Sequence, residues 1–276
     1  MYPIVETEAL SSAAHKLVVS APAIAKKVLP GQFIMLRIDE EGERIPLTVN
    51  DSDPEAGTIT LIFQPVGATT MQLETMKAGE ALLDVVGPLG NPTELEGATR
   101  ACVIGGGLGA AIAYPQAKWL HEHGISVDVI VGFRSKDIII LEDEFKAVAD
   151  NLIIMTDDGS NGNQGFVNVG LQKQIDAGVD YDLVLAIGPV IMMKTVAEVT
   201  RPLGIKTLVS LNPIMIDGTG MCGGCRVKVG GEYKHACVDG PDFDGHQVDY
   251  DEVMRRNRQF TTQEAQARDH VCKLGR

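Results

Sequence analysis

The sequence predicts three consecutive units: an antiparallel β-barrel, an α/β domain built on a parallel sheet, and a small cysteine-bearing segment at the C-terminus. Three observations indicate this order. Short β-branched stretches between turn residues fill the first part, apolar strands alternating with helices fill the second, and glycines and cysteines are concentrated in the third. We place the units at residues 1–97, 98–208 and 209–276.

The composition is that of a globular protein, and its charge limits the class of partner. Of the 276 residues, 45% are hydrophobic and 22% are charged, and the formal net charge is −13. Nucleic-acid binding depends on dense Lys and Arg, so the acidic balance argues against nucleic acid as a partner. The sequence has neither a run of about 18 apolar residues nor an export signal at its N-terminus. We therefore expect a cytoplasmic protein that does not contact membranes.

The barrel strands of the first unit are separated by Gly, Pro, Asp and Asn, as is typical of antiparallel sheets. The predicted strands are "HKLVVSAP", "GQFIMLRI", "RIPLTVND", "GTITLIFQPV" and "ALLDVVGPLG", and residues 72–79 predict a short helix. The stretch "ERIPLTVND" combines a cation, a proline-fixed backbone and a hydroxyl on one strand. Such groups can pair with a pyrophosphate and donate to a flavin ring, but by chemistry alone the stretch is also an ordinary strand.

The second unit predicts a parallel sheet covered on both faces, because its strands are apolar throughout and lie between helices. In "VIGGGLGAA", residues 103–111, a strand turns into a helix. Glycines at such a turn let the backbone approach a pyrophosphate at the helix N-terminus, although a plain tight turn is the alternative. The candidate contacts here are Gly106, Gly107, Leu108 and Gly109.

Three more strand ends carry turn residues, in "GFRSKD", "TDDGSNG" and "AIGPVIMM". In an open parallel sheet all of them meet at the carboxyl edge, where ligands bind. Asp157 and Asp158 could bind a ribose hydroxyl but would repel a 2′-phosphate, which favours NAD(H) over NADP(H). The alternatives are that these aspartates cap a turn and that Met192 is helix packing. The candidate contacts are Arg134, Asp157, Asp158, Gly188, Pro189 and Met192.

Three of the five cysteines fall within 16 residues, which indicates a metal or cluster site rather than a disulfide framework. A plant-type 2Fe-2S site has the pattern C-x4-C-x2-C followed by a distant C. Cys222, Cys225 and Cys237 match its last three positions, and counting back from Cys222 places Asp217 at the first. The spacing predicts a 2Fe-2S cluster held by one aspartate and three cysteines.

Zinc is the competing metal, because His235 would complete a tetrahedral Cys3His set with the same three cysteines. A single residue separates His235 from Cys237 in a predicted strand, and this does not match common zinc spacings. We interpret Cys102, within an apolar run, as a small buried hydrophobe. Cys272, near the end of the chain, is interpreted as a free thiol.

These motifs together resemble the ferredoxin reductase-like electron-transfer subunits. The likeness extends over nearly the whole chain, through "RIPLT", "GPLGN", "GGGLG", "GFRSKD", "TDDGS", "GPVIMM" and "DGTGMCGGC". Two branches are similar: the iron–sulfur subunit of dihydroorotate dehydrogenase B, with four cysteine ligands, and the small subunit of NADH-dependent ferredoxin:NADP+ oxidoreductase, with one aspartate and three cysteines. Asp217 favours the second branch, whereas ligation by Cys272 or Cys102 would favour the first.

The resemblance implies an oxidoreductase subunit that holds FAD, NAD(H) and a 2Fe-2S cluster. Many relatives carry an Arg where this chain has Ile45, so the neighbouring Arg44 is the candidate pyrophosphate contact, and Ile187 replaces a cysteine found in many relatives. Thr48 is implied to lie near the reactive N5 atom of the flavin. The implied flavin contacts are Arg44, Ile45, Pro46, Leu47, Thr48, Phe63, Gln64, Thr69 and Thr70.

The resemblance also implies hydride exchange between NAD(H) and FAD and single-electron exchange with the cluster, with no classical catalytic side chain. The implied partner is a large flavoprotein subunit with FAD and 4Fe-4S clusters, forming a heterodimer that handles ferredoxin and NADP(H) and can bifurcate electrons. A hypothesis of another class is a zinc-stabilised nucleotide-binding regulatory module without redox turnover.

Overall fold

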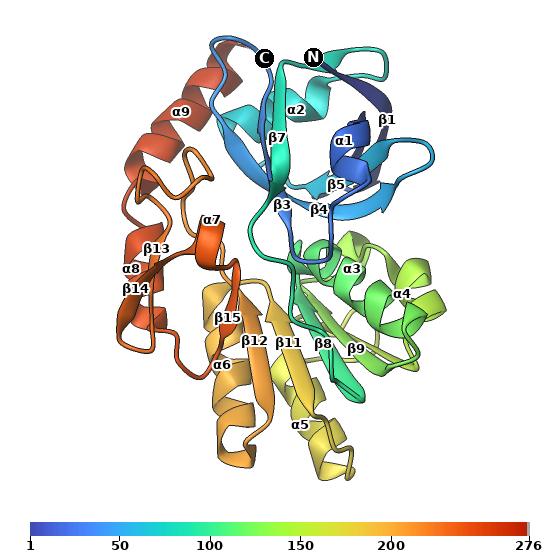
Figure 1. Ribbon diagram of the computed structural model, residues 1–276. Coiled ribbons are helices and arrows are strands. Elements are labelled where there is room, and N and C mark those ends of the chain that lie inside the picture. Colours follow the sequence, from blue (N-terminus) through green and yellow to red (C-terminus); the bar gives the residue numbers. More distant parts are fainter. Residues whose placement is uncertain (275–276) are drawn as a thin grey trace.

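The computed structural model describes the backbone of residues 1–274 and the side chains of residues 1–269 (Figure 1). The N-terminal sheet lies at the top of Figure 1, the second sheet lies below it, and the C-terminal segment runs along one side of both. In the described part of the chain, no helix combines the length and the apolar character needed to cross a membrane.

The first unit is a seven-stranded antiparallel sheet that curls into a barrel, with strand order β6-β1-β2-β5-β4-β3-β7. Alternate residues of each strand face its interior, where Leu17, Ile34 and Leu61 are almost completely buried. The elements are β1 (Tyr2–Ser11), β2 (Ala14–Ser20), α1 (Pro22–Ala25), β3 (Phe33–Arg37), β4 (Ile45–Asp53), β5 (Thr58–Phe63), α2 (Ala68–Thr75), β6 (Ala81–Leu82) and β7 (Asp84–Leu89).

Several elements of the barrel differ from the prediction, among them strand β1 and the short helix α2. Strand β1 was not among the predicted strands. Ile4 is its only buried residue, and the polar run after Ile4 hides the apolar–polar alternation of a strand. The short helix occupies 68–75 rather than 72–79. It begins earlier because the Thr70 hydroxyl accepts hydrogen bonds from the backbone N–H groups of Val66 and Gly67, at 3.1 and 3.0 Å.

The second unit is the predicted parallel sheet, with strand order β10-β9-β8-β11-β12. Helices α3 and α4 pack together on one face, and α5 and α6 pack together on the other. The elements are β8 (Arg100–Gly106), α3 (Gly109–Glu122), β9 (Ser126–Phe133), the 3-10 helix η1 (Lys136–Ile138), α4 (Glu142–Val148), β10 (Asn151–Thr156), α5 (Val167–Asp176), β11 (Leu183–Ile187), α6 (Val190–Thr200), the 3-10 helix η2 (Arg201–Leu203) and β12 (Lys206–Ser210).

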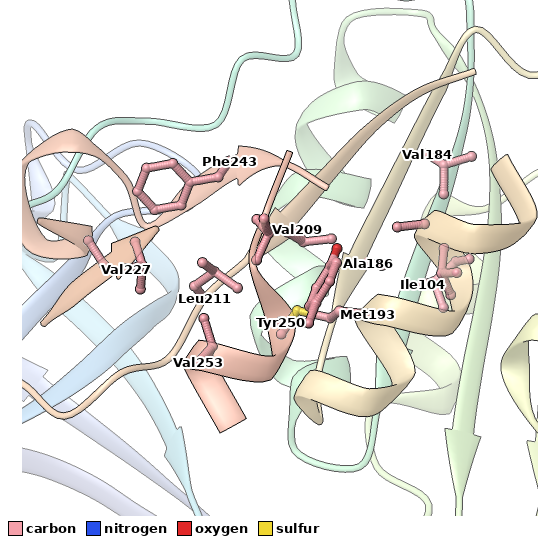
Figure 2. Close-up of a cluster of buried hydrophobic side chains, with 14 of the residues drawn as sticks. Ile104, Val184, Ala186, Met193, Val209, Leu211, Val227, Phe243, Tyr250 and Val253 are labelled. Atoms are coloured by element: carbon pink, nitrogen blue, oxygen red, sulfur yellow. The ribbon is translucent and has the colours of Figure 1, made fainter. Parts of the chain in front are cut away.

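The C-terminal segment joins this sheet, because β15 pairs antiparallel with β12. Figure 2 shows the shared core: Val227, Phe243 and Val253 of the segment lie beside Val209 and Leu211. The cysteine-bearing part is thus anchored to the α/β domain by apolar packing. The elements are β13 (Arg226–Val229), β14 (Glu232–His235), α7 (Ala236–Asp239), β15 (Asp242–Asp244), α8 (Tyr250–Asn257) and α9 (Thr261–Leu274).

Hydrogen bonds also fix the C-terminal segment to the link between the first two units. The Asn91 N–H donates to the Gly240 carbonyl at 2.6 Å, and the Thr93 hydroxyl donates to Asp242 at 2.5 Å. The barrel, the parallel sheet and the cysteine segment therefore hold fixed positions around one another.

Candidate functional site

Four loops gather at the carboxyl edge of the parallel sheet, as predicted. They follow β8, β9, β10 and β11, and backbone hydrogen bonds tie neighbouring loops together. The Gly107 N–H donates to the Gly132 carbonyl at 2.8 Å, and the Asp157 N–H donates to the Phe133 carbonyl at 3.0 Å. These hydrogen bonds hold neighbouring loops together at the edge where dinucleotides bind in open parallel sheets.

The glycines of the first loop permit a very close approach between the turns after β8 and β11. A β-carbon on Gly109 would lie 2.2 Å from the carbonyl oxygen of Ile187, and one on Gly106 would lie 2.5 Å from the sulfur of Met192. Gly107 has φ +56° and open space where its side chain would be. The loop therefore offers bare backbone to a pyrophosphate, and Met192 packs on this loop.

The two candidate aspartates have different roles in the loop after β10. Asp158 accepts a hydrogen bond from the Ser160 N–H at 2.9 Å. Its carboxylate therefore caps the turn, which was the alternative to ribose binding. Hydrogen bonds from the Ser160 hydroxyl and N–H hold the pKa of Asp158 below its ordinary value. Asp157 is exposed, and among the described side chains nothing bonds its carboxylate. Arg134, at the end of β9, is also exposed beside them.

The candidate flavin residues of β4 lie on two opposite faces of the strand, because successive side chains of a strand alternate in direction. Thr48 pairs with Phe33 and Pro46 pairs with Met35, whereas Leu47 pairs with Ile34. Directly opposed residues share a face. Ile45 and Leu47 accordingly pack on the barrel core, while Pro46 and Thr48 face outward with Phe33 and Met35.

The outer face of β4 lies between the other two candidate sites. At one end, Met35 contacts the cysteine segment, where a β-carbon on Gly218 would lie 2.7 Å from Met35 Cγ. At the other end, Asn50 donates a buried hydrogen bond of 2.6 Å to the carbonyl of Ala111, in the first turn of α3. Thr48 lies on the strand between these contacts, so a group bound there would adjoin both the nucleotide edge and the cysteine segment.

The remaining flavin candidates differ in how far their side chains are exposed and in which partners they contact. Phe63 is 2% exposed and points into the barrel, so its side chain is not available to a ligand. Gln64 and Thr69 are half-buried beside the start of α2, where the Thr70 hydroxyl is used as the helix cap. Arg44 is exposed and lies 3.5 Å from Asp84, which also pairs with Arg37.

Two of the three candidate cysteines of the C-terminal segment lie in contact with each other. The sulfur atoms of Cys225 and Cys237 are 3.2 Å apart, and both residues are buried. Burial, together with the neighbouring Cys225 thiol, raises the pKa of Cys237. Cys222 is exposed on the loop, with the Gly224 N–H directed at its sulfur at 3.4 Å. Cys237 lies in the short helix α7, not in the predicted strand.

Asp217 closes the same loop. Its two carboxylate oxygens accept hydrogen bonds from the N–H groups of Thr219 and Cys222, at 2.7 and 2.9 Å. The Thr219 N–H, with that of Cys222, holds the pKa of Asp217 below its ordinary value. Three thiols, an ionised carboxylate and surrounding glycine amides form a donor set that suits an iron–sulfur cluster.

Other candidate ligands are placed differently. Cys102 is completely buried in β8, within the core of the sheet. His235 ends β14 next to the cysteine loop. Within the described part of the chain, no three cysteine, histidine or carboxylate side chains are gathered as a site for a single metal ion. The side chain of Cys272 lies outside the described residues.

Comparison with known proteins identifies the family. Residues 212–249 match the model of the iron–sulfur cluster binding domain of dihydroorotate dehydrogenase B. The chain is 48% identical to an electron transfer subunit homologue of dihydroorotate dehydrogenase B (NAD(+)) from Thermotoga maritima, over 89% of this chain and 86% of that protein. It is 33% identical to the electron transfer subunit from Geobacillus thermodenitrificans, over 89% and 96%. The chain belongs to this family of electron-transfer subunits.

A solved structure of the NADH-dependent reduced ferredoxin-NADP oxidoreductase, studied for flavin-based electron bifurcation, is also similar. It has a TM-score of 0.93 and 43% identity, covering 99% of this chain and 98% of that chain. These matches confirm the predicted ferredoxin reductase-like fold and the prediction of an oxidoreductase subunit for electron transfer. The predicted cofactors, FAD, NAD(H) and an iron–sulfur cluster, agree with this family.

Sequence reasoning missed several residues that position the site in this family member. Asn50 and Met35, which join the outer face of β4 to its neighbours, carry no motif and could be found only from the strand pairing. Arg256, which contacts the cysteine loop, lies in the basic run "MRRNR" of an otherwise acidic chain. That run was the only signal available.

Proposed function

We propose that the chain is the small subunit of an NADH-dependent ferredoxin:NADP+ oxidoreductase, carrying electrons between NAD(H) and a larger partner subunit. NAD(H) would bind the carboxyl edge of the parallel sheet, and FAD the outer face of β4. Asp217, Cys222, Cys225 and Cys237 would hold a 2Fe-2S cluster. Bound FAD exchanges two electrons with NAD(H) and single electrons with the cluster.

The observation that carries this proposal is the position of Thr48. On one side of it, Asn50 donates to the Ala111 carbonyl in the first turn of α3. On the other side, Met35, the strand partner of Pro46, contacts the cysteine segment. The threonine hydroxyl can donate to a flavin ring atom, and Pro46 fixes the neighbouring backbone. Groups bound at the barrel, the nucleotide edge and the cysteine loop would therefore adjoin one another, as the proposed electron transfer requires.

The direct test is an anaerobic NADH titration of the purified chain, followed by visible absorption and electron paramagnetic resonance. We expect NADH to bleach flavin absorption and to produce the signal of a reduced 2Fe-2S cluster. A colourless protein that contains zinc would contradict the proposal and favour the regulatory module.

We predict that NADH bleaches the flavin faster than NADPH, and that Asp157→Asn narrows the difference. Asp157 is the aspartate with an unengaged carboxylate, and one exposed like charge about 4 Å away costs about 1 kcal/mol in water. The rate with NADPH should therefore rise about fivefold relative to NADH in stopped-flow measurements. Asp176→Asn, at the opposite end of α5, is the control and should leave the ratio unchanged. A wild-type preference for NADPH would overturn this role of Asp157.

The partner is proposed to be a large flavoprotein subunit with its own FAD and 4Fe-4S clusters, which handles ferredoxin and NADP(H). Apolar side chains that are unusually exposed surround the cysteine loop, where Ile216, Met221 and Val238 are 59, 88 and 43% exposed. Exposed apolar groups around a redox site favour a protein partner over solvent. We call these three residues the apolar rim.

We predict that Met221→Glu weakens binding of the large subunit about tenfold or more, because it places a charge on the most exposed residue of the apolar rim. Binding would be measured by calorimetry with the purified large subunit, and iron content would verify the cluster. Val5→Glu, an equally drastic change on the exposed side of β1, is the matched control. Equal affinities of the two variants would place the interface elsewhere.

A subunit of a dihydroorotate dehydrogenase B complex is the second candidate, favoured by the match of residues 212–249 to that family's iron–sulfur domain. That branch needs a fourth cysteine ligand, and Cys102 is buried within the sheet. Reconstitution with each type of large subunit would separate the candidates. Coupled reduction by dihydroorotate would support the second, and coupled ferredoxin and NADP(H) turnover the first.

A further inference from the structure

The last turn of helix α8 brings Arg256 to the cysteine loop. Figure 1 shows α8 beside β13 and β14. The helix begins with Asp249 as its cap, whose side chain accepts from the Glu252 N–H at 3.0 Å. Val253 is buried in the core that includes Val227 of β13. The last turn is therefore held in place, and there Arg256 Nη2 donates to the carbonyl of Gly224 at 3.2 Å.

Gly224 lies between two of the proposed cluster ligands, so this contact acts on the ligand loop itself. Its N–H is directed at the Cys222 sulfur at 3.4 Å, while its carbonyl accepts from Arg256. Cys225 follows directly and is 1% exposed. Gly224 is thus held through both its N–H and its carbonyl. The orientation of Gly224 determines how its N–H is directed at the sulfur of Cys222.

One guanidinium nitrogen of Arg256 has no partner in the described part of the protein. Arg256 Nε is buried and has no hydrogen-bond partner among the described residues. Arg256 as a whole is half-buried, and a buried donor without a partner on a cationic side chain is unfavourable unless negative charge lies nearby. The three thiolates and the Asp217 carboxylate would together carry more negative charge than the cluster core carries positive charge, so the loaded site would present net negative charge to this cation.

We propose that Arg256 is a positioning residue of the iron–sulfur site, which fixes the Gly224 peptide and raises the reduction potential of the cluster. This inference rests on the proposed function, because it assumes a cluster at the cysteine loop. Reduction of the cluster adds one electron, supplied by the flavin, and no bond to Arg256 forms or breaks. A fixed cation nearby stabilises the added negative charge, and net charge and hydrogen bonding are known determinants of cluster potential.

The test compares Arg256→Met with Arg256→Lys in the full-length protein loaded with FAD and iron–sulfur cluster. The midpoint potential of the cluster would be measured by redox titration with electron paramagnetic resonance. We expect a lower potential in Arg256→Met and a smaller shift in Arg256→Lys, which keeps the charge but not the planar donor group. Arg255→Met, exposed on the same helix, and Arg258→Met, exposed directly after its end, should match the wild type.

A potential in Arg256→Met equal to that in Arg255→Met would overturn the proposal. If Arg256→Met retains no iron, melting of the metal-free proteins decides. If metal-free Arg256→Met melts at the same temperature as the metal-free wild type, a role of Arg256 at the cluster is supported. If it melts at a lower temperature, the Arg256 bond only stabilises the fold, and the proposal is overturned. A wild-type protein without a cluster signal would instead refute the proposed function.

Discussion

Asp217→Ala is expected to remove most of the iron from the purified protein while leaving the flavin in place. The carboxylate is the proposed first ligand, and even residues that only orient a metal ligand are worth about 10- to 100-fold in metal affinity. Loss of a ligand should cost at least as much. Iron and flavin contents per chain after anaerobic purification measure the result.

Asp217→Asn separates ligation from loop folding. Both oxygens of Asp217 accept backbone hydrogen bonds, from Thr219 and Cys222, so the loop alone could explain this residue. Asparagine keeps one acceptor and removes the charge. Full iron content in Asp217→Asn would show that the residue only shapes the loop, whereas rescue by Asp217→Cys would support ligation.

The matched control is Asp239→Asn. Asp239 lies two residues after Cys237 and accepts from the His235 N–H at 2.6 Å, so it too is a carboxylate that bonds the backbone beside a proposed ligand. It stands outside the proposed ligand set, and its variant should keep its iron. Cys272→Ala is likewise expected to keep the cluster.

Local patterns were sufficient to predict the order of the units. Short stretches between turn residues are typical of an antiparallel barrel, and fully apolar strands between helices are typical of a buried parallel sheet. The buried strands β8, β9 and β11 read as apolar runs and were predicted correctly. The pattern failed where burial is uneven. Strand β1 has one buried residue, and β15 joins the sheet as a short antiparallel edge from a distant segment, which no local period records.

The candidate site was predictable where a motif has fixed spacing, and not where tertiary contacts assign the roles. The spacing before Cys222 selected Asp217 as a candidate ligand, and this role stays a prediction. The sequence could not show that Asp158 caps a turn while the Asp157 carboxylate has no partner among the described residues. Phe63 was a flavin candidate, but the alternation of β5 turns it inward. The contact of Arg256 with the cysteine loop spans 32 residues and depends on the packing of α8.

Gly109→Ala is expected to damage both stability and nucleotide binding. The added β-carbon would lie 2.2 Å from the Ile187 carbonyl oxygen and 2.8 Å from Gly188 Cα, and backbone atoms cannot rotate away. Overpacking of this kind costs about 1–3 kcal/mol of unfolding free energy. It would also separate the turns after β8 and β11, and a displacement of about 1 Å can cost about 100-fold in rate.

The NADH concentration that half-saturates flavin bleaching should therefore rise about 10- to 100-fold, alongside a lower melting temperature. Gly124→Ala is the matched control, because Gly124 has φ +71° and no neighbour within 4 Å, and it lies at the other end of α3. Alanine at position 124 would be strained by the left-handed backbone alone, which lowers the free energy of unfolding by about 1–2 kcal/mol. Both variants should thus melt earlier, but only Gly109→Ala should need more NADH. Equal NADH requirements would show that the glycine turns support the fold and do not cradle the nucleotide.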